Sequence, residues 1–366
     1  MSVEPLVPET KVLAIASHVV YGRVGNTMAA FVMQTLGCEV AALNTVHYSN
    51  HLGYRQSKGT KTSADDISDL YVGLKQSYLT DFDIMLTGYA PNAKAVDAIG
   101  AIGRDLKLKA STKPGSFFWV LDPVMGDEGR IYVDEDVIPA YRGLLRDADL
   151  ILPNQFELEL LSEIEIRSTL DLTKAITKLH QDYRVPHIVV TSVRFDPLSP
   201  FISIVGSTSC ADGSPRLFKV DVPAIDCFFS GTGDMFAALT VVRLREAVSN
   251  EGLFASKAWQ SPDETDALEL PLAKAVEKVL GSMHVILQKT KVARDAELEK
   301  MSGPQGAIEK DSEKRVHLRK TKAAEVRLVR NLRDLGEPAI CHQAQALTKT
   351  ESWNPARLPQ PKGGTA

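Results

Sequence analysis

The segment FFSGTGDMFAALTV, residues 228–241, combines residue types that can bind an anion and move a proton. Gly231 and Gly233 flank Thr232 and can adopt backbone conformations that other residues avoid. The apolar run after them is predicted to be a helix, so this turn lies at a helix N-terminus, where free N–H groups and the helix dipole favour an anion. Asp234 would repel a phosphate. It is either an ordinary first-turn acid or a general base for an attacking hydroxyl.

Polar residues also follow several short apolar runs of the chain. In an open parallel sheet, ligands bind beyond the carboxyl ends of the strands, so these residues are candidates for the same site. They are Ser17, Asp122, Asp127, Asn154, Glu157, Thr191 and Ser192. Combined with the glycine turn they indicate phosphoryl transfer, in which the turn holds the phosphates and the carboxylate of Asp234 receives the hydroxyl proton. Polyphosphates need Mg²⁺, for which Asp127 and Glu157 are suitable ligands.

The elements that must position these residues alternate along the chain. Continuous apolar runs are typical of strands buried on both faces of a parallel sheet. They cover residues 11–17, 40–46, 83–89, 117–123, 149–154 and 187–193, and helix-like segments cover 24–37, 63–77 and 155–164. This alternation predicts an α/β fold, a three-layer αβα sandwich with a mostly parallel central sheet.

Composition excludes several classes of protein. The 366 residues carry a net charge of −4, which disfavours a nucleic-acid binder. The four cysteines form no CxxC pair, so we expect neither a zinc site nor a disulfide framework, and a reducing compartment. With no signal peptide and no apolar run long enough to span a membrane, we expect a cytoplasmic protein, with the nucleus as an alternative.

Four further patterns could suggest other chemistries but fit them poorly. The glycine turn lacks the third glycine of a dinucleotide-binding loop, and residues 53–63 have the wrong order for a P-loop. His18, His47 and His51 have no zinc-ligand spacing, so structural or substrate-pocket roles are favoured. Cys227 precedes the glycine turn by four residues and is interpreted as a packing residue rather than a nucleophile.

The later part of the chain is predicted to leave the core. We expect a single domain over residues 11–340, with surface insertions near 251–270 and 291–322. Nine charges among residues 309–322 predict a solvated loop or an exposed helix. Residues 343–366 are rich in Pro and Gly without periodicity towards their end, and we expect a disordered tail.

Several separated motifs together resemble one family. They are SHVVYGRVGN (17–26), NTVHYSNHLGY (44–54), LTGY (86–89), DPVMGD (122–127), PNQFELELL (153–161), VVTS (189–192) and GTGDMFAA (231–238). In this order they resemble the pyridoxal kinases of the ribokinase-like superfamily, whereas GTGD alone marks only the superfamily. The resemblance implies ATP-dependent phosphorylation of the 5′-hydroxymethyl group of pyridoxal, pyridoxine or pyridoxamine. It also implies small-molecule substrates and a homodimer, without nucleic acid or membrane.

The resemblance assigns roles to matching positions. Residues expected at the B6 substrate are Ser17, Val24, Val46, Tyr48, Leu52, Tyr89, Tyr132 on a covering loop, and the base Asp234. Residues expected at ATP are Asp122, Asn154, Glu157, Thr191, Ser192, Ile225, Asp226, Cys227 and the anion-hole residues Gly231, Thr232 and Gly233. For metals, Asp127 and Glu157 would hold Mg²⁺, and Asp122 and Thr191 are candidates for a monovalent cation such as K⁺.

Two positions depart from the family pattern and leave alternatives open. Leu152 stands where Thr often precedes PNQFE, which leaves potassium dependence open, and Leu52 replaces a Thr, which leaves the preferred vitamer open. The alternatives are a hydroxymethylpyrimidine or sugar kinase of the same fold, or a non-catalytic paralogue that binds B6 or nucleotide. Asp234 disfavours the pyrimidine kinases, which usually carry Cys there. The intact Asp127, Glu157 and Asp234 disfavour the paralogue.

Overall fold

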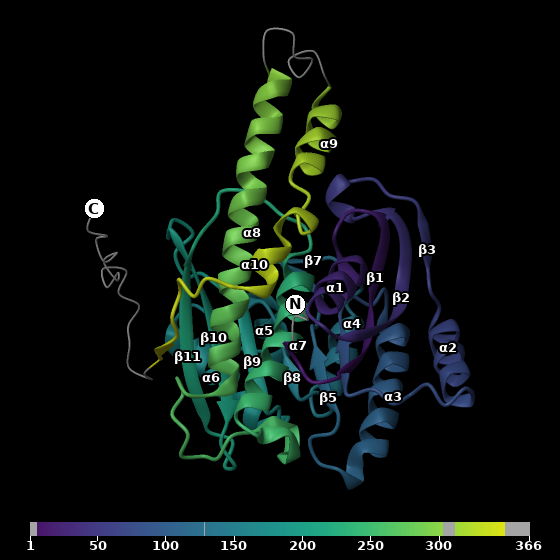
Figure 1. The fold of residues 1–366 in the computed structure, drawn as a ribbon, viewed down its shortest axis with the longest axis vertical. Helices are drawn as coiled ribbons and strands as arrows, with labels where there is room; N and C mark the ends of the chain where they lie inside the picture. Colours follow the sequence, from purple (N-terminus) through teal and green to yellow (C-terminus); the bar gives the residue numbers. More distant parts are fainter. Residues whose placement is uncertain (1–5, 128, 303–311, 348–366) are drawn as a thin grey trace, which may run out of the picture.

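The computed structural model describes residues 6–127, 129–302 and 312–347. Most of its strands belong to one sheet, in the order β12-β11-β10-β9-β8-β5-β4-β1-β2-β3 (Figure 1). The strands of this sheet are β1 (Lys11–Tyr21), β2 (Glu39–Asn50), β3 (Gly59–Lys61), β4 (Ile84–Thr87), β5 (Phe118–Leu121), β8 (Leu150–Ile151), β9 (His187–Val193), β10 (Phe201–Ser209), β11 (Pro215–Pro223) and β12 (Gln345–Ala346). Strands β6 (Gly126–Asp127) and β7 (Arg130–Ile131) form a separate hairpin.

The centre of the sheet is parallel. Strand β1 pairs with β2 and β4, and the parallel pairing continues through β5 and β8 to β9. The outer strands β3, β10, β11 and β12 are antiparallel to their neighbours. All residues of β4 and β5 are buried, which explains why their sequences are continuously apolar rather than alternating.

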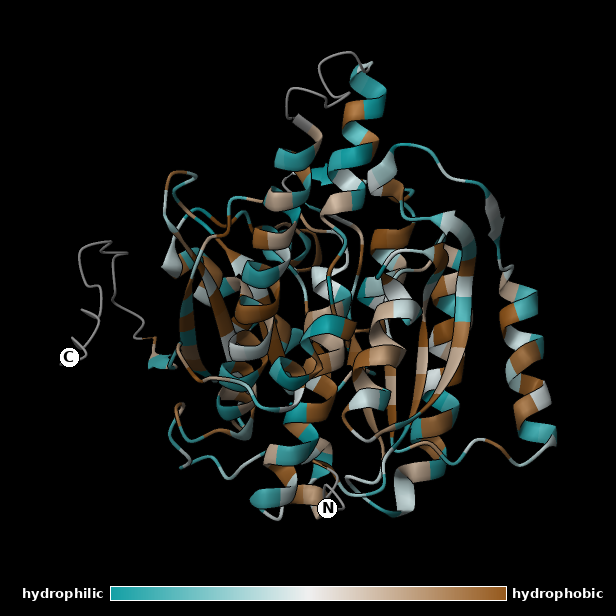
Figure 2. Cartoon of the chain, turned by 45° about the horizontal axis from the view of Figure 1, so that its top comes forward, coloured by the Kyte–Doolittle hydropathy of each residue, from teal (hydrophilic) through white to brown (hydrophobic). Residues whose placement is uncertain are grey.

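Helices cover both faces of the sheet. They are α1 (Gly25–Thr35), α2 (Ala64–Gln76), α3 (Ala93–Lys109), α4 (Val137–Leu144), α5 (Gln155–Ser162), α6 (Thr169–Asp182), α7 (Thr232–Asn250), α8 (Pro271–Ser302), α9 (Glu313–Ala323) and α10 (Leu332–Gly336). The core on one face contains side chains of α1, α7 and α8, and that on the other face side chains of α2 to α6. Figure 2 shows the hydrophobic strands between these layers. The predicted three-layer αβα sandwich with a mostly parallel sheet is therefore confirmed.

The segments expected to lie outside the core behave differently from one another. Helix α8 extends from the body of the molecule and packs against α9, so the charged segment 291–322 forms exposed helices where it is described (Figure 1). By contrast, the segment 251–270 reaches the core, because its Trp259 is buried and stacks on Phe118 with ring centroids 4.0 Å apart. Burial of the large Trp259 ring explains why the segment 251–270 is held against the core despite its polar composition.

The C-terminal end of the described chain is also part of the fold. Residues Gln345–Ala346, which we expected to belong to the disordered tail, form β12 and pair with β11 at the edge of the sheet. The remainder of the predicted tail, 348–366, lies outside the described residues. In the part of the chain that the structure describes, no helix is long and apolar enough to cross a lipid bilayer.

Candidate active site

A cavity of about 540 Å³ opens where the parallel strands end, and it gathers most of the residues singled out from the sequence. Those that line it are Ser17, Val24, Val46, Tyr48, Leu52, Tyr89, Asp122, Asp127, Tyr132, Asn154, Glu157, Thr191, Ser192, Gly231, Thr232, Gly233 and Asp234. The proposed adenosine neighbours Ile225, Asp226 and Cys227 are not among its lining residues. Residues from β1, β2 and β9, and from the segments after β4, β5 and β8, thus converge on one space.

The glycine turn begins α7, as its sequence predicted. Gly231 is the N-cap residue and has a φ of +81°, in the left-handed region that favours glycine. A Cβ atom there would lie 2.1 Å from the carbonyl oxygen of Arg23, so the close approach of the two backbones also requires glycine. Because Gly231, Thr232 and Gly233 line the cavity, the first N–H groups of α7 lie at its wall. Asp122 is beside them, since its Oδ2 lies 3.8 Å from the position that a Cβ atom on Gly233 would occupy.

Asp234 lies in the first turn of α7 and is only partly exposed. Burial raises the pKa of its carboxyl to about 6, and hydrogen bonds from the backbone N–H groups of Gly25 and of Asp234 itself limit the rise. Gly25 is also the point where α1 meets β1, because a Cβ there would lie 2.0 Å from the Ser17 carbonyl oxygen. A carboxyl with this pKa is mostly ionised at neutral pH and can still accept a proton efficiently.

Two further carboxyl groups, those of Asp122 and Glu157, line the same cavity as Asp234. Burial, and then the charges of Glu157 and Asp234, raise the pKa of Asp122 well above its ordinary value. Burial also raises the pKa of Glu157 to about 7, although three backbone N–H groups oppose this rise. Like charges confined in a partly desolvated space disfavour one another's ionisation, so this group of acids is suited to receive a cation.

Glu157 also has a structural role. Its Oε1 accepts hydrogen bonds from the N–H groups of Met125 (2.9 Å) and Gly126 (3.4 Å), and its Oε2 accepts one from Asn154 N–H (2.9 Å). Asn154 in turn caps α5 by accepting from Glu157 N–H at 2.8 Å. Glu157 therefore fixes the DPVMGD loop against α5.

The residues present are compatible with Mg²⁺. No cluster of three or more His, Cys, Asp or Glu side chains is close enough to hold a metal alone in the described ranges. Mg²⁺ does not require such a cluster, because it usually binds one or two carboxylates together with water and substrate phosphates. The exposed Asp127 and the buried Glu157 line the same cavity and supply such oxygens, whereas the buried Leu152 offers no side-chain oxygen to any cation.

The structure adds lining residues that the sequence did not reveal as site residues: Val19, Gly53, Val124, Phe228, Phe229, Ser230, Phe236 and Met283. His51, for which a structural or substrate-pocket role was expected, and Leu152 also line the cavity. Phe228, Phe229 and Ser230 directly precede the glycine turn, and the SNHLGY motif contains His51 and Gly53. These two motifs are the sequence signals that could have identified those residues as part of the site. Met283 comes from α8, which carries no local pattern that points to a site.

Comparisons with known proteins place this chain in a family. Residues 87–252 match the family model described as phosphomethylpyrimidine kinase. The pyridoxal kinase of Ovis aries is 33% identical over 93% of this chain and 99% of its own length, and that of Homo sapiens is 31% identical over the same shares. The chain belongs to the pyridoxal kinase family. It is therefore a kinase with the ATP binding that this family has.

A solved pyridoxal kinase structure supports the family assignment at the level of the whole fold. The enzyme of Leishmania donovani, in complex with ADP and pyridoxamine, is 28% identical and matches with a TM-score of 0.74 over 93% of this chain and 100% of that one. The pyridoxal kinase family assignment and the αβα fold predicted from the sequence are thus both confirmed.

Proposed function

We propose that this protein phosphorylates the 5′-hydroxymethyl group of pyridoxal with ATP, and accepts pyridoxine and pyridoxamine in the same way. The observation that carries the proposal is the convergence of the glycine turn, Asp234 and the predicted substrate residues on one cavity. Its support from relatives is the ligand set of the Leishmania donovani pyridoxal kinase, which has been solved with ADP and with pyridoxamine or pyridoxine.

In the proposed mechanism the B6 alcohol binds between apolar and aromatic side chains. Val24, Val46 and Tyr48 would line the pyridine ring, with Leu52 beside them and Tyr132 above them, while Ser17 and Tyr89 would contact its polar groups. The 5′-hydroxyl would then lie against Asp234. The carboxylate takes the proton as the hydroxyl attacks, which a pKa of about 6 allows at neutral pH.

The phosphates of ATP would be bound by the N–H groups of Gly231, Thr232 and Gly233, which can stabilise charge that develops during transfer. The remaining proposed nucleotide contacts are Asp122, Asn154, Glu157, Thr191, Ser192 and residues 225–227. Asp127 and Glu157 would hold Mg²⁺, which supplies positive charge next to the transferred group. Asp122 and Thr191 remain the candidates for a monovalent cation, and Leu152 predicts little difference between K⁺ and Na⁺ buffers.

The proposal is tested by incubating the purified full chain with MgATP and pyridoxal, and following the absorbance of the phosphorylated aldehyde. A hydroxymethylpyrimidine, which the matching family model makes the main competing substrate, and ribose are assayed in parallel. Mg²⁺-dependent product from pyridoxal supports the proposal. Turnover of another alcohol alone, or binding of ATP without turnover of any substrate, would replace it by a sister kinase or a non-catalytic paralogue.

We also propose that residues 11–340 form the catalytic unit and that the protein is a homodimer. Light scattering of the purified chain tests the proposed homodimer, and a monomer at assay concentrations would refute it.

A further inference from the structure

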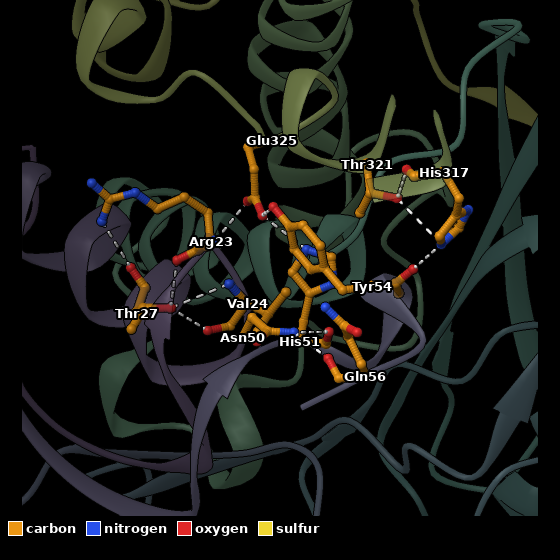
Figure 3. Close-up of polar contacts among 12 residues, drawn as sticks. Arg23, Val24, Thr27, Asn50, His51, Tyr54, Gln56, His317, Thr321 and Glu325 are labelled. Carbon is orange, nitrogen blue, oxygen red and sulfur yellow. Dashed lines mark hydrogen bonds and ion pairs between the residues drawn. The ribbon is translucent and has the colours of Figure 1, made fainter. Parts of the chain in front are cut away.

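A carboxylate from the C-terminal part of the chain joins two loops of the cavity (Figure 3). Glu325 follows α9, and its side chain is 16% exposed. Its Oε1 accepts hydrogen bonds from His51 Nε2 and from the Tyr54 hydroxyl, each at 2.9 Å. Its Oε2 accepts one from the backbone N–H of Arg23 at 3.1 Å. One side chain thus contacts segments that are about 270 to 300 residues away in the sequence.

Both loops belong to the cavity that we assign to the substrates. The first, residues 51–54, supplies His51, Leu52 and Gly53 to its wall. The second, residues 22–24, supplies Val24, and its Arg23 carbonyl packs against Gly231 of the glycine turn. A shift of Glu325 would therefore move both walls of the cavity.

The contact is tight and is supported by a second one. A Cβ atom on Gly22 would lie 3.0 Å from Glu325 Oε1, and Gly22 has a φ of +116°, so glycine allows the backbone to approach the carboxylate. On α9 itself, His317 Nε2 lies 2.9 Å from the Gly53 carbonyl oxygen and can donate to it. Helix α9 and Glu325 therefore hold the loop 51–54 at two points.

The hydrogen bonds determine which ring nitrogen of His51 carries a proton. An ionised carboxylate can only accept, so Nε2 must donate to Glu325. Burial opposes ionisation of Glu325, but the hydrogen bond and charge of His51 and the hydrogen bond of Tyr54 outweigh it and lower the pKa of Glu325. His51 Nδ1 is buried and has no hydrogen-bond partner among the described residues. The contact with Glu325 is therefore made through Nε2, and Nδ1 takes no part in it.

We propose that Glu325 is a positioning residue for the B6 alcohol: it holds loops 22–24 and 51–54 together and keeps a proton on His51 Nε2, the ring nitrogen that faces it. The effect of Glu325 on catalysis that we expect rests on the proposed function. It makes the segment around α9, which resembles a charged surface insertion in the sequence, part of the support of the active site. Glu325 itself does not line the cavity.

The first test is the protonation state of His51 in the unmodified protein. Long-range ¹H–¹⁵N spectra of full-length protein with ¹⁵N-labelled histidine distinguish the two neutral tautomers and the cation, and eight histidines make such a spectrum tractable. The His51 signal is assigned by its loss in His51→Gln. A ring that carries a proton on Nε2 is expected. A ring protonated on Nδ1 alone would overturn the proposal.

The second test uses Glu325→Gln, Glu325→Asp and, as a matched control on the preceding helix α9, the exposed Glu313→Gln. A glutamine can accept hydrogen bonds with only one end, so either Arg23 N–H or the pair His51 and Tyr54 loses its acceptor. Because a buried donor is left unpaired, we expect the KM for pyridoxal to rise at least about ten-fold. The KM for ATP should change less than about three-fold, Glu325→Asp should fall between wild type and Glu325→Gln, and Glu313→Gln should match wild type.

The outcomes separate this inference from the proposed function. A lower melting temperature of Glu325→Gln with unchanged KM values would show a purely structural residue and refute the positioning role. Equal rises of both KM values would refute it as well. If the wild-type protein phosphorylates no B6 alcohol, the proposed function fails, whereas the His51 spectrum still decides whether the ring donates to Glu325 through Nε2. The spectrum also decides if Glu325→Gln does not fold.

Discussion

Replacing Asp234 by asparagine should abolish most of the activity and at the same time stabilise the protein. The native carboxyl has a pKa of about 6, against an ordinary value of 3.8. Since each tenfold change in a proton-binding constant is worth about 1.4 kcal/mol, ionised Asp234 destabilises the native state by about 3 kcal/mol. The asparagine side chain would remove this charge and could still accept the hydrogen bond from Gly25. The loss of a general base should lower kcat by about 10²- to 10⁴-fold.

The sign of the pH dependence follows from the two pKa values. Between pH 3.8 and 6 the native carboxyl retains its proton while the unfolded chain has released it, so the destabilisation grows with pH over this window. The advantage of Asp234→Asn should therefore be about 3 kcal/mol at pH 8 and about half of that at pH 5. Removal of the charge beside Asp122 acts in the same direction, since Asp234 helps to raise the pKa of Asp122.

The assay is urea unfolding of wild type and Asp234→Asn at both pH values, in EDTA and without nucleotide. Asp69→Asn, an exposed aspartate on α2, controls for loss of a negative charge alone and should give no comparable gain. A variant that is no more stable than wild type at pH 8, or whose gain is the same at both pH values, would show that Asp234 does not have a raised pKa. Near-full activity of Asp234→Asn would remove it as the base.

Two other substitutions test the phosphate and metal ends of the site. Gly231→Ala places a methyl group against the Arg23 carbonyl and strains a left-handed backbone, so kcat should fall at least about 100-fold. A variant with wild-type kcat would show that the turn does not bind the transferred phosphoryl group. Glu157→Gln keeps the shape of the side chain but removes the negative charge proposed to hold Mg²⁺, so the Mg²⁺ concentration for half-maximal rate should rise. An unchanged Mg²⁺ titration would leave Glu157 with its structural role only.

The sequence predicted the layers of the fold, and the polar residues that gather at the carboxyl ends of its strands, for a physical reason. Strands buried on both faces must be continuously apolar, and this makes β4 and β5 recognisable without any partner. The carboxyl ends of parallel strands then meet at one edge, so the order of residue types alone predicts that Asp122 and Asn154 lie near each other. Gly231 could be singled out because few residue types other than glycine adopt the left-handed conformation of this turn before α7.

What the sequence did not predict depends on contacts between distant segments. Trp259 lies in a polar segment, and only its stacking on Phe118 shows that the segment is held in the core. Met283 and Glu325 reach the cavity and its loops from the C-terminal helices. No local periodicity or spacing marks such residues, because their roles depend on partners that are distant in the sequence: Phe118 for Trp259, and Arg23, His51 and Tyr54 for Glu325.

The charges of the cavity explain why these distant supports are needed. The N-terminus of α7 offers roughly half a positive charge, whereas Asp122, Glu157 and Asp234 together can carry three negative charges. The cavity alone would therefore repel a polyphosphate, and a nucleotide must arrive with its own cation. The proposed base Asp234 directly follows the glycine turn that we propose to bind the phosphates, so this turn must be held rigidly despite the repulsion. Arg23 packs on Gly231 and donates to Glu325, so the C-terminal segment contributes to that rigidity from outside the cavity.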